Sequence, residues 1–126
     1  MTPQQFLAEA ANLLEGPRPS MRRCWQRGCA CLTRLALEHG LRRYWSRVSP
    51  TVAHCPIRHQ LLALPSFADP QTARIARTAW HGLSRAVHHH TYELAPTHAE
   101  LHSWHDDVVT LLDRLDRIGG SPSIRT

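Results

Sequence analysis

The sequence contains no lysine, and all fifteen of its basic residues are arginines. Codon bias in a GC-rich genome explains this composition without reference to function, but its physical consequence stands whatever the origin. Arginine carries a permanent charge on a planar fork that suits phosphate groups. The net charge is +5, so we expect an acidic partner, with nucleic acid ahead of a membrane surface.

Metal-binding cysteine pairs and long apolar runs are also missing. The four cysteines, Cys24, Cys29, Cys31 and Cys55, form no CxxC pair and match no standard zinc spacing. No apolar run approaches the roughly 18 residues that a membrane span needs. The amphipathic start of the chain lacks the basic segment of a signal peptide. We therefore expect a soluble, cytoplasmic protein without a membrane partner, whose reduced thiols are buried as small hydrophobes.

Strand-like alternation is scarce, whereas apolar residues recur at the three- and four-residue spacing of helices. A hydrophobic content of 42% in 126 residues supports one small folded domain over residues 1–118, followed by a flexible tail over residues 119–126. We expect an all-α fold of four to five helices in an up-and-down bundle. The expected helices cover residues 3–15, 21–48, 56–64, 71–88 and 98–118.

Capping residues mark the starts of most of these helices. A glycine inside a helix costs about 1 kcal/mol relative to alanine, so Gly40 predicts a weak point or a kink in the second helix. The expected caps are Thr2 before Pro3, Ser20, Asp69 before Pro70, and the capping box of Thr97 and Glu100.

Each long helix carries one apolar stripe that we expect to face the core. The expected core residues are Phe6, Leu7, Ala10, Leu13 and Leu14 in the first helix; Leu32, Leu35, Ala36, Leu41, Tyr44, Trp45 and Val48 in the second; Ala76, Trp80, Leu83 and Val87 in the fourth; and Leu101, Trp104, Val108, Leu111, Leu112 and Leu115 in the last.

The histidines do not predict a metal site. Successive residues on a helix point about 100° apart, so the histidine triplet at 88–90 cannot converge on one ion. His98, His102 and His105 share one side of the last helix, but no nearby pattern supplies the further ligands of a zinc site. An exposed polar face is the favoured interpretation, and we expect neither a metal nor another cofactor.

An arginine and a histidine at the end of the fourth helix suggest chemistry that needs no metal. Arg85 lies on the non-core face with Arg74, Arg77 and His81, which we expect to bind RNA. His90 follows where the helix should end, and it can fold back toward Arg85. Histidine can move protons near neutral pH, and arginine can hold a phosphate that the substrate's own 2′-hydroxyl attacks. From chemistry alone, the simpler interpretation is that these are basic residues at a helix end, stabilised there by the helix dipole.

The stretch SRAVHHHTY places Arg85, His90 and Tyr92 in the spacing Rx4HxY. It resembles the arginine–histidine motif of HEPN domains, which are small all-helical proteins, several of them toxins. The resemblance extends over roughly residues 56–115. It implies a metal-independent endoribonuclease that acts as a dimer, with the motifs of two subunits facing one cleft and Arg85 and His90 as the catalytic pair. Tyr92 matches the tyrosine that a partner nucleotidyltransferase antitoxin modifies with AMP in some two-gene systems.

One position departs from the family's pattern. The residue after the arginine is usually polar in active members, and here it is Ala86. Ser84 or His89 are candidates to supply that polar group. Three functions therefore stay open: a dimeric ribonuclease of the toxin or defence type, a catalytically silent HEPN-like module that binds RNA, nucleotide or protein, and a helical interaction protein.

Overall fold

The computed structural model describes residues 1–16, 24–88 and 95–119. Every regular element in these residues is helical, which confirms the all-α fold. The α-helices are α1 (Pro3–Glu15), α2 (Trp25–Val48), α3 (Pro50–Ala53), α4 (Ile57–Ala63), α5 (Pro70–Val87) and α6 (His98–Gly119), and a 3-10 turn, η2 (Leu64–Ser66), follows α4.

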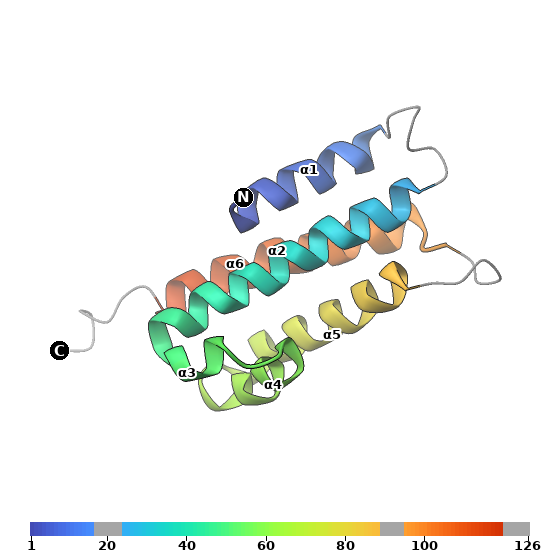
Figure 1. Cartoon of the computed structure of the whole chain (residues 1–126). Helices are drawn as coiled ribbons and strands as arrows, with labels where there is room; N and C mark the ends of the chain where they lie inside the picture. Colours follow the sequence, from blue (N-terminus) through green and yellow to red (C-terminus); the bar gives the residue numbers. More distant parts are fainter. Residues whose placement is uncertain (17–23, 89–94, 120–126) are drawn as a thin grey trace.

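The four long helices run alternately up and down the bundle (Figure 1). Helices α2 and α6 form its centre, and each contacts both α1 and α5. The short helices α3 and α4 lie at the end where α2 finishes and α5 begins. This arrangement places the last turn of α5 at the opposite end of the bundle, beside the first turns of α2 and α6.

The core is formed by the apolar stripes that the sequence predicts, with a few exceptions. The prediction that Val48 belongs to the core is wrong. Its side chain is 37% exposed, because it is the last residue of α2, where the chain turns into α3. Leu35 is only half-buried. The largest fully buried apolar side chains are Leu37, Leu41, Tyr44, Trp45, Leu64, Leu83, Leu101, Val108, Leu111 and Leu115.

Three of the predicted caps are present. Thr2 and Gln5 form a reciprocal capping box, with Thr2 N–H donating to Gln5 Oε1 (2.7 Å) and Gln5 N–H donating to Thr2 Oγ1 (3.1 Å). Thr97 and Glu100 form the second box, at 3.0 and 3.1 Å. Asp69 accepts a hydrogen bond from a backbone N–H in the first turn of α5. Local hydrogen bonding therefore fixes the starts of α1, α5 and α6.

Other helix boundaries differ from those that the sequence predicts, or lie outside the described residues. The predicted cap Ser20 and the predicted start at Met21 lie outside the described residues, and α2 is described from Trp25. A helical turn, α3, forms where the sequence predicts only a turn, because Pro50 at its first position already has a helical φ angle. The next helix begins one residue late, with Pro56 as its N-cap.

Gly40 of α2 and Gly82 of α5 lie where α6 packs closely against each of these helices. Helix α2 is one continuous helix across Gly40, from Trp25 to Val48. A Cβ atom at Gly40 would overlap the Leu112 side chain of α6, and a Cβ at Gly82 would lie 2.6 Å from the Trp104 ring. Both glycines therefore permit contact between helices, which outweighs their low helix propensity.

We expect Gly82→Ala to lower the free energy of unfolding by about 1 kcal/mol, measured by urea denaturation. Alanine gains about 1 kcal/mol of helix propensity, but overpacking against a ring costs about 1–3 kcal/mol. Gly16→Ala is the control, because no atom lies within 4 Å of a Cβ there. A Gly82→Ala variant as stable as the wild type would contradict the close approach of α5 and α6.

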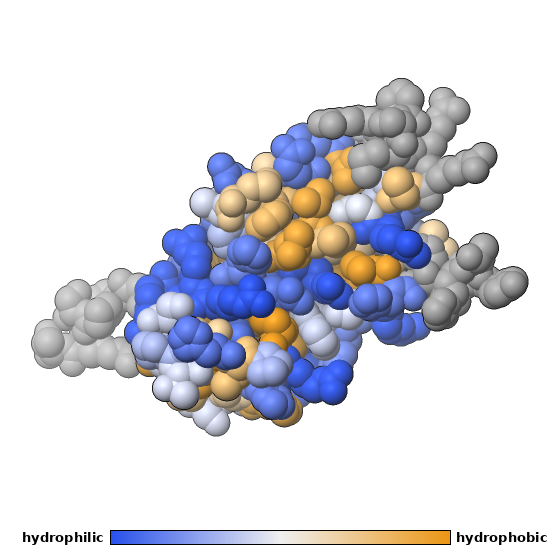
Figure 2. Space-filling view, in the orientation of Figure 1, coloured by the Kyte–Doolittle hydropathy of each residue, from blue (hydrophilic) through white to orange (hydrophobic). Residues whose placement is uncertain are grey.

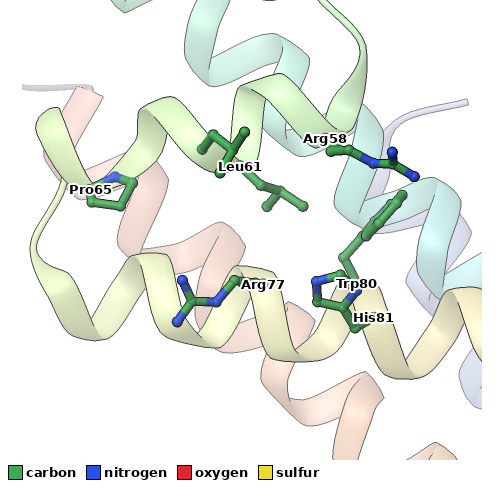
Figure 3. A pocket seen from close by; sticks show the side chains of 7 residues that line it. Arg58, Leu61, Pro65, Arg77, Trp80 and His81 are labelled. Atoms are coloured by element: carbon green, nitrogen blue, oxygen red, sulfur yellow. The ribbon is translucent and has the colours of Figure 1, made fainter.

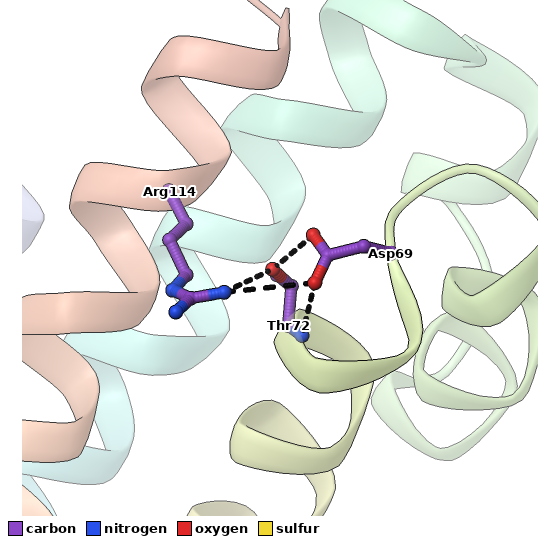
Figure 4. A network of polar contacts seen from close by, with 3 residues as sticks. All are labelled: Asp69, Thr72 and Arg114. Atoms are coloured by element: carbon purple, nitrogen blue, oxygen red, sulfur yellow. Dashed lines mark hydrogen bonds and ion pairs between the residues drawn. The ribbon is translucent and has the colours of Figure 1, made fainter.

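A polar network joins the start of α5 to α6 (Figure 4). The Thr72 hydroxyl donates to Asp69 Oδ1 (2.6 Å), and the Thr72 N–H donates to Oδ2 (3.0 Å). Arg114 of α6 lies 3.5 Å from Asp69 Oδ2 and donates to Thr72 Oγ1 (3.3 Å). The hydrogen bonds from Thr72, and more weakly the charge of Arg114, lower the pKa of Asp69 below its ordinary value of 3.8.

A lowered folded-state pKa stabilises the fold only while the carboxylate is ionised. The contribution of Asp69 is therefore complete above its ordinary pKa of 3.8 and is lost as the pH falls through the lower folded value. We expect the stability difference between wild type and Asp69→Asn, measured by urea denaturation, to be constant from pH 7 to pH 5 and to shrink below about pH 4. Burial, and then the neighbouring Asp106, shift the pKa of Asp107 upward, so the difference between variants must be compared rather than the wild-type curve. A difference that persists unchanged to pH 2 would contradict the network.

Candidate functional site

The structure places four basic residues of α5 on its exposed side, as the sequence predicts. Their spacing keeps them within roughly a quarter of the helix circumference. The opposite side is buried and consists mainly of alanines, which let α5 pack closely on α2 and α6. We call these four residues the α5 basic face: Arg74, Arg77, His81 and Arg85.

Arg85 lies in the last turn of α5, and its side chain is exposed. The helix ends at Val87, where the His88 N–H donates to the Ser84 carbonyl (3.2 Å). The partial negative charge of a helix C-terminus favours a cation in this position. The Ser84 Oγ is buried and makes no hydrogen bond within the described residues. Its hydroxyl is therefore not at the surface that Arg85 occupies.

The remaining members of the predicted site, His89, His90 and Tyr92, lie outside the described residues. The pairing of Arg85 with His90 stays a prediction for that reason. What the described part does provide is the position of Arg85 and the point at which α5 ends.

Ala86, the departure from the HEPN pattern, is only 5% exposed and belongs to the core. Its position follows from the helix, because it shares the buried face with Leu83 and Ala79. The residue directly after Arg85 therefore faces the interior. Even a polar side chain at this position would not extend from the exposed face of α5.

A network that no sequence pattern indicated ties the end of α5 to α2. Arg34 Nε lies 3.6 Å from Glu38 Oε2, and the Trp80 indole N–H donates to the same oxygen (3.0 Å). Arg34 Nη1 lies 3.5 Å from His88 Nε2. A guanidinium can only donate, so this contact needs an unprotonated Nε2 on His88. These residues hold the last two turns of α5 against α2.

A small pocket lies between α4 and α5, beside the α5 basic face (Figure 3). Its volume is about 110 Å³. Apolar side chains form most of its wall, and basic side chains surround them. The residues that line it are Arg58, Leu61 and Leu62 from α4, Pro65 from η2, and Arg77, Trp80 and His81 from α5.

A second basic surface lies on α2, away from α5. Figure 2 shows hydrophilic side chains along α2 and apolar side chains between α1 and α2. An open groove of about 680 Å³ there is lined in part by His39, Arg42, Arg43 and Arg47. Arg47 pairs with Asp116 at 3.6 Å, while Arg42 and Arg43 are exposed. Positive charge is therefore spread over two faces of the protein, and charge alone does not select one of them.

The histidines of α6 act separately. His98 Nε2 donates to the Leu14 carbonyl and His105 Nε2 to the Leu7 carbonyl, each at 2.9 Å. His102 lies 3.2 Å from Asp106. The expected exposed polar face is wrong for His105, which is half-buried against α1. Within the described residues, no three His, Cys, Asp or Glu side chains lie close enough together to hold a metal ion.

The thiols do not form a reactive site in the described part of the chain. Only Cys29 is buried, whereas Cys24 is exposed and Cys31 and Cys55 are half-buried, so the expectation of four buried thiols is wrong. Burial raises the pKa of the Cys29 thiol, which the nearby Thr33 only partly offsets. A raised pKa keeps this sulfur protonated and weakly nucleophilic at neutral pH.

No helix of the described residues is both long enough and apolar enough to span a membrane. No family model, no curated protein and no solved structure matches this chain.

Proposed function

We propose that this protein is a metal-independent endoribonuclease of HEPN type that works as a dimer, with Arg85 and His90 as its catalytic pair. The observation that carries the proposal is the end of α5 at Val87, two residues after Arg85. On a continuous helix, residues five apart would point roughly 140° away from each other. Because α5 ends before residue 90, the chain is released from that constraint and His90 can turn back toward Arg85.

The chemistry needs only groups that this chain has. His90 takes the proton of an RNA 2′-hydroxyl, and the 2′-oxygen attacks the adjacent phosphorus. The bond to the 5′-oxygen breaks, and that oxygen takes up a proton from water. Arg85 binds the phosphate and stabilises the charge that develops on it. The products are a 2′,3′-cyclic phosphate and a 5′-hydroxyl, and the α5 basic face binds the neighbouring phosphates.

The buried position of Ala86 favours a second candidate, a silent HEPN-like module that binds RNA without cleaving it. Such a module would use the same α5 basic face. Ser84 does not supply the missing polar group at the surface, because its hydroxyl is buried. Of the two candidates to supply that group in an active enzyme, Ser84 and His89, only His89 remains.

An RNA cleavage assay in EDTA separates these functions. The ribonuclease cleaves RNA as wild type and loses cleavage in both Arg85→Ala and His90→Ala. RNA binding without cleavage by any form identifies the silent module. A protein that neither binds nor cleaves RNA is a helical interaction protein, and both RNA proposals then fail.

The same proposal gives Tyr92 a role in control. A partner nucleotidyltransferase antitoxin would attach AMP to Tyr92, two residues from His90. The added bulk and negative charge would exclude RNA from the cleft. On this proposal, the protein acts in the cytoplasm as a toxin or defence effector. Mass spectrometry of the chain expressed with a neighbouring nucleotidyltransferase tests it, by a mass increase confined to the peptide with Tyr92.

A further inference from the structure

The pocket between α4 and α5 combines a flat apolar wall with two arginines at its edge. Leu61 and the Trp80 ring form the wall, and Arg58 and Arg77 lie on opposite sides of it (Figure 3). A planar, weakly polar ring would fill the apolar part. An anionic group attached to that ring would reach the arginines.

Trp80 is held in place before any ligand arrives. Its indole N–H donates to Glu38 Oε2 of α2 at 3.0 Å, and its side chain is half-buried against the core. A side chain fixed in this way loses little conformational entropy when a ring stacks on it. The pocket therefore offers a preorganised stacking surface.

The two arginines carry charge that the protein does not neutralise. Arg58 and Arg77 are exposed, and neither makes an ion pair within residues 1–16, 24–88 and 95–119. By contrast, Arg34, Arg47 and Arg114 all lie within 4 Å of a carboxylate. Uncompensated guanidiniums beside an aromatic wall match the phosphate and base of a nucleotide.

We propose that this pocket binds one nucleotide of an RNA strand, with the base against Trp80 and the flanking phosphates on Arg58 and Arg77. Sites that enclose a whole small molecule have volumes of about 300–1,000 Å³, whereas this pocket measures about 110 Å³. It therefore accepts a single base and leaves the backbone outside. Along α5, Arg77 is about 12 Å from Arg85, so one strand can reach both. The choice of RNA as the source rests on the proposed function, and a free mononucleotide has the same chemistry.

Binding is measured by fluorescence anisotropy with a labelled 2′-O-methyl octanucleotide, which lacks the 2′-hydroxyl and cannot be cleaved by the proposed reaction. We expect the double variant Arg58→Ala/Arg77→Ala to weaken binding at least tenfold at fixed, moderate salt. Arg42→Ala/Arg43→Ala removes the same charge from the groove on α2 and should weaken binding less than threefold. Equal weakening by the two double variants would mean that RNA is attracted to positive charge without preference for the pocket, and would overturn the proposal.

Leu62 allows a test that does not disturb the fold, because it lines the pocket and is 73% exposed. We expect Leu62→Glu to weaken binding about tenfold, since it places a negative charge beside the phosphates. Leu62→Gln has the same shape without the charge and should stay within about twofold. Trp80→Phe keeps a ring and should bind better than Trp80→Leu, because stacking on an aromatic ring contributes to affinity. Equal binding by Leu62→Glu and Leu62→Gln would overturn the proposal.

The Trp80 indole N–H resonance in a ¹⁵N spectrum identifies the source of the nucleotide. A shift with the octanucleotide but not with AMP supports a strand, and a shift with both supports nucleotide binding from either source. No shift with any nucleotide, or the same shift with inorganic phosphate, overturns it. If wild type cleaves no RNA but Trp80 responds, the proposed function fails and the pocket stands. If cleavage depends on Arg85 and His90 while Leu62→Glu binds RNA as well as Leu62→Gln, the pocket fails and the function stands.

Discussion

Arg85→Ala is expected to lower the rate constant of RNA cleavage by about 10²–10³-fold, the usual loss when one group that stabilises the transition-state charge is removed. His90→Ala is expected to cost about 10²–10⁴-fold, as for the loss of a general base. Both rates are measured in EDTA with saturating RNA and an end-labelled substrate. The labelled products should carry a 2′,3′-cyclic phosphate.

Arg85→Lys sharpens this experiment. Lysine keeps the positive charge but loses the planar fork that grips two phosphate oxygens. We expect its rate to fall between those of wild type and Arg85→Ala. An exposed side chain contributes little to stability, so the unfolding free energies of wild type, Arg85→Ala and Arg85→Lys should agree within about 0.5 kcal/mol. Loss of activity with retained stability assigns Arg85 to the chemistry.

Arg43→Ala is the matched control, because Arg43 is an exposed arginine of α2, away from the α5 basic face. Its cleavage rate should stay close to that of wild type. Cleavage that survives in Arg85→Ala, or that EDTA abolishes in wild type, would be incompatible with the proposed mechanism.

Trp45→Ala is expected to lower the free energy of unfolding by about 3–5 kcal/mol, the range for removing a large buried ring. Trp45 is 0% exposed and packs edge-on against Tyr44 and Phe67, with ring centroids 5.1 and 4.9 Å away. Small domains are stable by only about 5–15 kcal/mol in total. The variant should therefore unfold at a much lower urea concentration, followed by circular dichroism at 222 nm.

Trp45→Phe separates the ring from its polar atom. The indole N–H of Trp45 is buried without a hydrogen-bond partner in the described part of the chain, and an unpaired buried donor costs about 1–3 kcal/mol. Phenylalanine keeps most of the packing and removes this donor, so we expect a loss below about 2 kcal/mol. Equal losses in the two variants would contradict the packing around Trp45.

The parts of the fold that depend on neighbouring residues were predictable from the sequence. The apolar stripe and the basic face of α5 follow from helical spacing, and the caps at Thr2, Asp69 and Thr97 follow from hydrogen bonds over three residues. The position of Arg85 on the exposed face was predictable for the same reason.

Contacts between distant segments left no local signal. The contact of Arg34 with His88 joins residues 54 apart, and the pocket joins Arg58 to Trp80 only because α4 packs beside α5. Gly82 was not singled out in the sequence, because what requires a glycine there is the Trp104 ring of another helix. Such features depend on how helices pack, and helix packing is not encoded in the spacing of one segment.

The two histidine bonds between α6 and α1 have a geometric consequence. His98 meets Leu14 and His105 meets Leu7, so the residue numbers of each pair add up to 112. This constant sum describes two antiparallel helices in a fixed register, with one bond every two turns. Sliding α1 by a single residue would break both bonds together, so the two hydrogen bonds fix the register of α1 against α6. An imidazole can donate from Nε2 whether neutral or protonated, so the alignment holds in both protonation states of the histidines.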